Sequence, residues 1–268
     1  MSQALEAAGS THVPINARSQ IQERVTAGRV TWMGPLLLVA ARPVLFVTFQ
    51  GVLAIVLLAF HRPFPWQAAG AWWNVYGTLV DLGCLVGLRY FTRREGILLR
   101  DLIGPIHMRR GRDLLLGLGY FLLIFPLFIG GGLLAQVLLY GSASKAPIAY
   151  LMQAHHLPVW AMVYSLTLWW FISSPTEEAT FQGYALPRLQ ALTGRTWIAF
   201  PIVCLCWAAQ HCALPFMPDW RFLLYRFIAF LPGVLVMMAV YLRTRRLAPL
   251  ILAHWPMDIL GAIMTGIH

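Results

Sequence analysis

The feature that most constrains this chain is a series of long apolar runs separated by short polar or basic segments. About 20 mostly apolar residues are enough to cross the hydrocarbon core of a bilayer as a helix. Seven candidate spans occur, at about 36–60, 66–90, 114–140, 159–190, 197–213, 222–242 and 247–267. An open strand in lipid would leave its backbone groups unpaired, so all seven are expected to be helices. The sequence therefore predicts an all-α fold, a polytopic transmembrane helical bundle of about seven spans.

The composition supports this reading and excludes a nucleic-acid partner. Apolar residues make up 59% of the chain and charged residues 11%, whereas soluble domains carry about 25% charged residues. The net charge is +10, but the basic residues cluster between the apolar runs, where they act as orientation signals. The expected partners of these clusters are membrane lipids.

The basic residues also predict an orientation. With a cytoplasmic N-terminus, 15 of them lie on the cytoplasmic side and only Arg62, Lys145 and Arg221 lie outside, as the positive-inside rule requires. Lys145 is the single lysine among 20 basic residues, which is typical of a GC-rich bacterial genome. We therefore expect a multi-pass protein of the cell membrane, in bacteria the inner membrane.

The fourth apolar run is too long for a single span. As one helix it would measure about 50 Å, and it contains the sequence Ser173-Ser174-Pro175-Thr176-Glu177. Ser174 as N-cap, Pro175 at the first helical position and Glu177 at the third are typical of a helix start. The sequence therefore predicts one broken helix, with its break near 173–177.

Several ionisable residues lie inside the predicted spans, where they are costly and therefore candidates for function. At about 1.5 Å per helical residue, four of them lie in one layer near the middle of the bilayer: Glu177, His211, His254 and Asp258. His254 and Asp258 are four residues apart and share one helix face, as do Glu178 and Gln182. In contrast, Asp81 has no partner by spacing and is interpreted as structural, Arg42 as a snorkelling cation, and Arg226 as too near the outer face to pair with Asp81.

A carboxylate with two imidazoles can activate a water molecule. A base takes the proton, and neutral donors stabilise the developing oxyanion. The same residue types also suit a metal site. A zinc ion held by Glu177, His211 and His254 therefore stays open, and the residues alone leave the metal content unknown.

Three short motifs resemble those of the CPBP family, the CAAX prenyl endopeptidases and their Abi-type relatives. The sequence from Glu177-Glu178 to Gln182 resembles EExxxR, Trp207-Ala-Ala-Gln-His211 resembles FxxxH, and His254-Trp-Pro-Met-Asp258 resembles HxxxN or HxxxD. They occur in family order on three successive segments, within residues 160–265. Two departures are visible, because Gln182 replaces the arginine and Trp207 replaces the phenylalanine.

The resemblance implies an intramembrane endopeptidase, a hydrolase acting on a peptide or lipidated protein substrate. Glu177 would activate the water with help from His211, His254 and Asp258 would support the oxyanion, and Glu178 would be a less essential glutamate with Gln182 beside it. Gln182 removes a charge partner of Glu178. The alternative is therefore a non-catalytic scaffold or immunity protein of the same fold, and a transporter is a third class.

The chain then divides into three parts. Residues 1–32 are a polar cytoplasmic segment, residues 33–150 hold the N-terminal transmembrane helices and a basic cytoplasmic loop, and residues 151–268 hold the CPBP-like catalytic helices.

Overall fold

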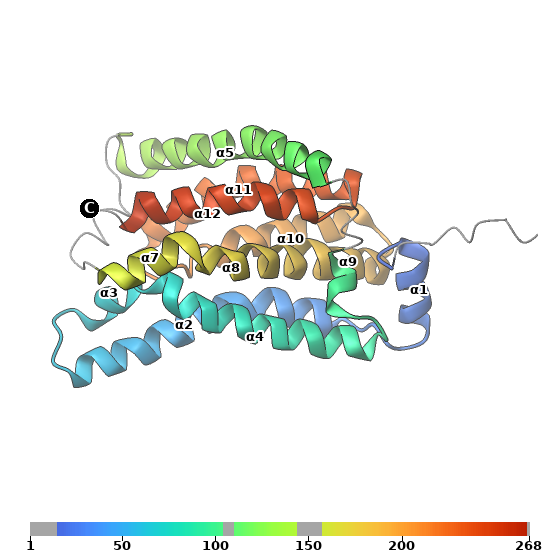
Figure 1. Cartoon of the computed structure of the whole chain (residues 1–268), viewed down its shortest axis with the longest axis horizontal. Helices are drawn as coiled ribbons and strands as arrows, with labels where there is room; N and C mark the ends of the chain where they lie inside the picture. The colour runs from blue at the N-terminus through green and yellow to red at the C-terminus, as the bar shows by residue number, and fades with distance from the viewer. Residues whose placement is uncertain (1–14, 104–109, 144–156, 267–268) are drawn as a thin grey trace, which may run out of the picture.

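The computed structural model describes residues 15–103, 110–143 and 157–266, and they form an all-helical bundle (Figure 1). The elements are α1 (Arg18–Thr26), α2 (Met33–Ala59), α3 (Pro65–Gly70), α4 (Trp73–Arg94), the 3₁₀ turn η1 (Leu99–Leu102), α5 (Arg110–Tyr140), α7 (Val159–Thr167), α8 (Trp169–Glu178), the π-helix η2 (Ala179–Ala185), α9 (Leu186–Thr193), α10 (Thr196–Gln210), α11 (Trp220–Thr244) and α12 (Ala248–Gly266). Each predicted span has a helical counterpart among them.

The membrane-spanning character follows from length and from the apolar side chains on the outside. Three of the described helices are long and apolar enough to cross a bilayer: Met33–Ala59, Gly111–Tyr140 and Trp220–Thr244. Large apolar side chains lie exposed along them, among them Ile55, Leu115 and Leu138. Such an exposed apolar surface is unfavourable in water and suits contact with lipid tails. The chain is therefore a helical membrane bundle, as predicted.

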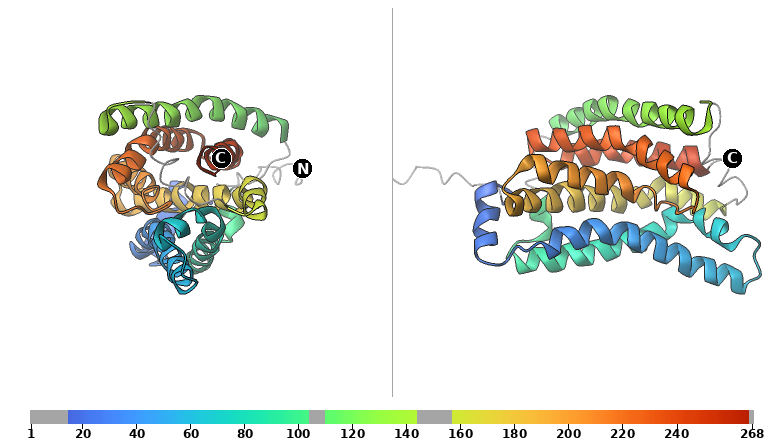
Figure 2. Two further views of the ribbon diagram at one scale, coloured as in Figure 1. Left: turned by 90° about the vertical axis from the view of Figure 1, so that its left-hand side faces the viewer. Right: turned by 180° about the vertical axis from the view of Figure 1, so that it is seen from behind.

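The helices lie in layers (Figures 1 and 2). Helix α5 covers one side and packs on α11 and α12, while α2 and α4 pair on the opposite side. Between them run α7, α8 and α10, and α8 contacts both α4 and α12. Residues 176–191, from the end of α8 through η2 to α9, are buried without exception. The segment that holds both glutamates is thus the most enclosed part of the bundle.

The predicted break at 173–177 is wrong in position. Ser174 and Pro175 lie inside α8, and the helical path is instead interrupted at Leu168 and widened into a π-helix from Ala179. The Ser174 hydroxyl donates to Asp258 in place of capping a helix. Pro175 has no backbone N–H to donate to the carbonyl of Phe171, and membrane helices tolerate such prolines inside a bundle. Beside it, Thr176 Oγ1 donates to the Ile172 carbonyl oxygen, 2.6 Å away.

The end of the bundle that carries α1 is tied together by buried ion pairs. The guanidinium of Arg188 on α9 lies 2.7 Å from a carboxylate oxygen of Glu95, and Arg24 on α1 reaches the same oxygen at 3.3 Å. Arg188 also donates to Asn16, 2.8 Å away. Helix α1 is thereby fixed against the end of the central segment.

Candidate active site

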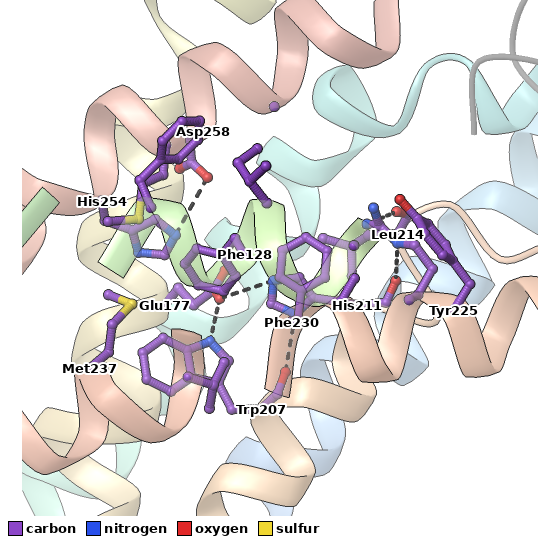
Figure 3. Close-up of a pocket in the computed structure, with 18 of the residues that line it drawn as sticks. Phe128, Glu177, Trp207, His211, Leu214, Tyr225, Phe230, Met237, His254 and Asp258 are labelled. Carbon is purple, nitrogen blue, oxygen red and sulfur yellow. Dashed lines mark hydrogen bonds and ion pairs between the residues drawn. The ribbon is translucent and has the colours of Figure 1, made fainter. Parts of the chain in front are cut away.

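A cavity of about 230 Å³ opens beside the central segment, and all four predicted catalytic residues line it. Glu177 comes from α8, His211 from the end of α10, and His254 and Asp258 from α12. The remaining wall is mainly apolar and aromatic, and it includes Phe128, Phe230 and Met237 (Figure 3). Elements far apart in sequence thus bring a small polar group to the wall of an apolar cavity.

The Glu177 carboxylate is held from two helices. From α10, Trp207 Nε1 and Gln210 Nε2 both donate to Oε1, the latter over 2.5 Å. From α2, Arg42 Nη2 lies 3.0 Å from Oε2. Oε1 thus accepts two hydrogen bonds, and Oε2 faces a guanidinium.

His211 faces the same carboxylate without bonding to it directly. Its Nε2 lies 3.9 Å from Glu177 Oε1, and its Nδ1 lies 3.1 Å from the Trp207 carbonyl oxygen. A carbonyl oxygen only accepts, so Nδ1 carries the proton, and Nε2 of the neutral ring is an acceptor. A gap of this width accommodates a water oxygen at about 2.8 Å from each group.

Arg226 lines the cavity too, beside His211. It donates to the carbonyl oxygens of His211 and Leu214, at 3.0 and 2.6 Å. These carbonyls lie just beyond the end of α10, where a cation is favourable. As expected from the sequence, Arg226 does not pair with Asp81; it fixes the turn that carries His211.

The structure corrects the sequence interpretation of Arg42 and Asp81. Arg42 is fully buried and does not snorkel, and Asp81 on α4 is its ion-pair partner. Arg42 also donates to Ser173 Oγ at 3.2 Å, in addition to its contact with Glu177. The spacing rules missed this pairing because the two residues lie on different helices, 39 positions apart.

A second polar group surrounds His254. Its Nδ1 lies 2.9 Å from Glu178 Oε1, and its Nε2 lies 3.4 Å from Asp258 Oδ1. The other Asp258 oxygen accepts from Ser174 Oγ at 2.6 Å. His254 can donate to both carboxylates when both ring nitrogens carry protons. Figure 3 shows His254 and Asp258 on one wall and Glu177 with His211 on another.

Gln182 does not take the part that its spacing predicted. Both its amide atoms are buried, and neither has a hydrogen-bond partner among the described residues; the same is true of Glu178 Oε2. Gln182 lies inside η2, where the backbone follows the wider i→i+5 pattern,. The pairing expected for an α-helix at i,i+4 is therefore not formed.

Trp207 and Gln210 donate hydrogen bonds to Glu177 that the sequence interpretation missed. Trp207 stacks on Phe181 with ring centroids 5.4 Å apart and an angle of 5° between the rings. This packing directs its indole N–H at Glu177. The phenylalanine of the family motif has no such donor. The departure from FxxxH is the signal that pointed to it.

The zinc alternative requires a group of three ligands. Among the described residues, no three or more His, Cys, Asp or Glu side chains are grouped so that they could hold a metal ion. Glu177 and His211 face each other, whereas the Nδ1 of His254 is taken by Glu178. As they are arranged here, Glu177, His211 and His254 do not form a ligand set.

The comparison with family models identifies the region that carries this site. Residues 158–260 match the model described as type II CAAX prenyl endopeptidase Rce1-like. No curated protein and no solved structure matches the chain. The match confirms the resemblance seen in the three motifs, and it covers less than half of the chain. Arg42 and Asp81 lie outside the matched region.

Proposed function

We propose that this membrane protein, whose residues 158–260 belong to the Rce1-like family, is an endopeptidase that hydrolyses a peptide bond of a membrane-associated or prenylated substrate. The observation that carries the proposal is the gap of 3.9 Å between Glu177 Oε1 and His211 Nε2 on the cavity wall. A carboxylate and an unprotonated imidazole nitrogen both accept hydrogen bonds. One water molecule can therefore donate a proton to each and turn a lone pair toward a substrate carbonyl.

The reaction then follows from the positions of the groups. Glu177 takes the water proton as the oxygen attacks the carbonyl carbon, and it later gives that proton to the leaving amine. Glu178 holds the His254 ring through Nδ1, and Nε2, which lies 3.4 Å from Asp258 Oδ1, turns its N–H to the oxyanion as that charge develops,. Asp258 accepts from Ser174 and so supports His254 in place of donating itself.

The cavity favours a substrate segment that is apolar. Aromatic and aliphatic side chains from α5 and α11 cover the wall that faces the polar groups. An extended peptide or a lipid-modified chain buries its apolar surface there at about 25 cal/mol per Å². Exclusion of bulk water strengthens the electrostatic interactions at the scissile bond.

The decisive experiment compares wild-type protein with Glu177→Gln in lipid nanodiscs. Each is incubated with a library of apolar and prenylated peptides in H₂¹⁸O, and products are identified by mass spectrometry. Wild type is expected to release fragments with one ¹⁸O in the new carboxylate, and Glu177→Gln to lose about 10²–10⁴-fold in rate. The control is Glu23→Gln, which changes an exposed glutamate of α1.

A non-catalytic scaffold of the same fold is the second candidate, favoured by the missing cation at Gln182. It predicts that wild-type and Glu177→Gln proteins both bind peptides and that neither cleaves them. Cleavage at equal rates by both proteins would instead remove Glu177 from the mechanism.

A further inference from the structure

Arg42 is the most enclosed cation next to the site, and the region matched to the family does not contain it. Its side chain has no exposed surface, and it is in contact with Glu177, Ser173 and Asp81. We propose that Arg42, anchored by Asp81, is a positioning residue that fixes the Glu177 carboxylate for attack by water. This inference rests on the proposed function and extends the site to helices α2 and α4.

The Glu177 carboxylate is held at both oxygens. Trp207 and Gln210 donate to Oε1 from α10, and the Arg42 guanidinium pairs with Oε2 from α2. Rotation of the carboxylate would break these hydrogen bonds and the ion pair. Oε1 is thereby kept opposite His211 Nε2, across the gap of 3.9 Å. A base held in this orientation needs less reorganisation before it accepts the proton.

The charge of Arg42 compensates two buried carboxylates. Glu177 and Asp81 are two acidic groups inside a membrane bundle, where an uncompensated charge is costly. Arg42 lies between them and contacts both. The planar guanidinium carries five donors in a fixed fork, so it can bind both carboxylates and Ser173 at once. Asp81 thereby sets the position of Arg42, and Arg42 sets that of Glu177.

Gln182 stands where the family motif has its arginine, five residues after the first glutamate. Here that position holds a buried amide without a hydrogen-bond partner among the described residues. This chain brings a guanidinium to Glu177, the first glutamate of the motif, from a different helix. The N-terminal helices are then part of the active site and not only its membrane anchor.

A purely structural ion pair would explain the burial of Arg42 as well, so the test separates stability from turnover. Four variants are compared: Arg42→Met, Asp81→Leu, the double variant Arg42→Met/Asp81→Leu, and Arg42→Lys. Arg42→Met leaves Asp81 without its cation, and Asp81→Leu leaves Arg42 with Glu177 as its remaining ion-pair partner. The double variant removes the whole Arg42–Asp81 pair, and apolar replacement of a buried pair is often neutral for stability; Glu177 then keeps its hydrogen bonds from Trp207 and Gln210. Thermal unfolding and steady-state kinetics are measured on each in the same nanodiscs.

We expect the double variant to unfold close to the wild-type temperature and yet to lose about 100-fold in kcat, since a small misplacement of a catalytic group costs that much. KM should stay within about threefold, because Arg42 does not line the cavity,. Arg42→Lys keeps the charge but not the fork, and it should recover part of the lost kcat.

The control is Arg188→Met/Glu95→Leu, which removes another fully buried ion pair and, like the Arg42→Met/Asp81→Leu variant, takes the partner from one further buried group, here Arg24. It should leave kcat of the folded protein within about threefold of wild type, since neither residue lines the cavity,.

Wild-type kcat in a folded double variant would overturn the inference and leave the proposed function intact. If the Arg42→Met variants do not accumulate, Arg42→Lys decides: unchanged kcat overturns the inference, and a fall in kcat at constant KM supports it. Glu177→Gln in the same assay tells the two failures apart, because full activity there removes the proposed function itself.

Discussion

Glu177 and Glu178 are neighbours in sequence but occupy different surroundings. Glu177 lines the cavity, and donors from α2 and α10 reach both of its oxygens. Glu178 is completely buried, does not line the cavity, and bonds only to His254, with Oε2 unpartnered among the described residues. Consecutive helical side chains point about 100° apart, so Glu177 faces the cavity and Glu178 faces His254.

The two glutamates therefore divide the site into two halves with different hydrogen-bond partners. The Glu177 half, with His211, Trp207 and Gln210, can hold and activate water. The Glu178 half, with His254, Asp258 and Ser174, can orient a donor toward the oxyanion. The hydrogen bonds that hold each half differ in charge and geometry, so substitutions in the two halves should lower kcat by different factors.

The largest effect is expected from the two histidines. His211→Ala removes an acceptor of the water, and His254→Ala removes the oxyanion donor, so each should lower kcat by at least about 100-fold. If Glu177 and His211 act on one water molecule, Glu177→Gln/His211→Ala will be no worse than Glu177→Gln alone. Single-turnover kinetics, with a peptide that the wild-type protein cleaves, measure the rate of each variant. A variant that retains more than about a tenth of wild-type turnover would take its histidine out of the catalytic group.

A smaller and unequal effect is expected when one supporting hydrogen bond is removed on each side. Trp207→Phe restores the family residue but deletes the donor to Glu177, and we expect a loss of about tenfold in kcat, as for a charged hydrogen bond worth about 1.5 kcal/mol. Ser174→Ala deletes the donor to Asp258, one step further from the reaction, and should cost about threefold or less. The two variants are compared in one assay at equal concentrations of folded protein. A larger loss with Ser174→Ala would reverse the assignment of the two halves.

The smallest effect is expected at Asp258. Asparagine can still accept from Ser174 or from His254, so Asp258→Asn should keep kcat within about twofold, the lower end of the range for one ordinary hydrogen bond. The same variant tests the zinc alternative, since a ligating or tautomer-fixing carboxylate would be far more sensitive. Metal analysis and chelator treatment accompany the kinetics. Stoichiometric zinc, with activity lost on chelation and regained on zinc addition, would overturn the metal-free mechanism.

Much of the bundle could be predicted because its determinants are local. Each span is encoded by its own apolar run, and the motif spacing placed Glu177, His211, His254 and Asp258 at one depth. All four line one cavity in the structure. The helix break could not be placed in this way, because the Ser174 hydroxyl that suits an N-cap is taken by Asp258, 84 residues away.

The sequence by itself thus determined the membrane bundle, the family resemblance and the residues that reach the cavity. The partners of these residues depend on tertiary packing. Arg42 pairs with Asp81 and with Glu177, Trp207 and Gln210 donate to Glu177, and Glu178 bonds to His254. The reason is physical. Apolar burial and helical spacing act over a few residues along the chain, whereas a buried charge is stabilised by whichever donor the packing of distant helices brings within about 3 Å.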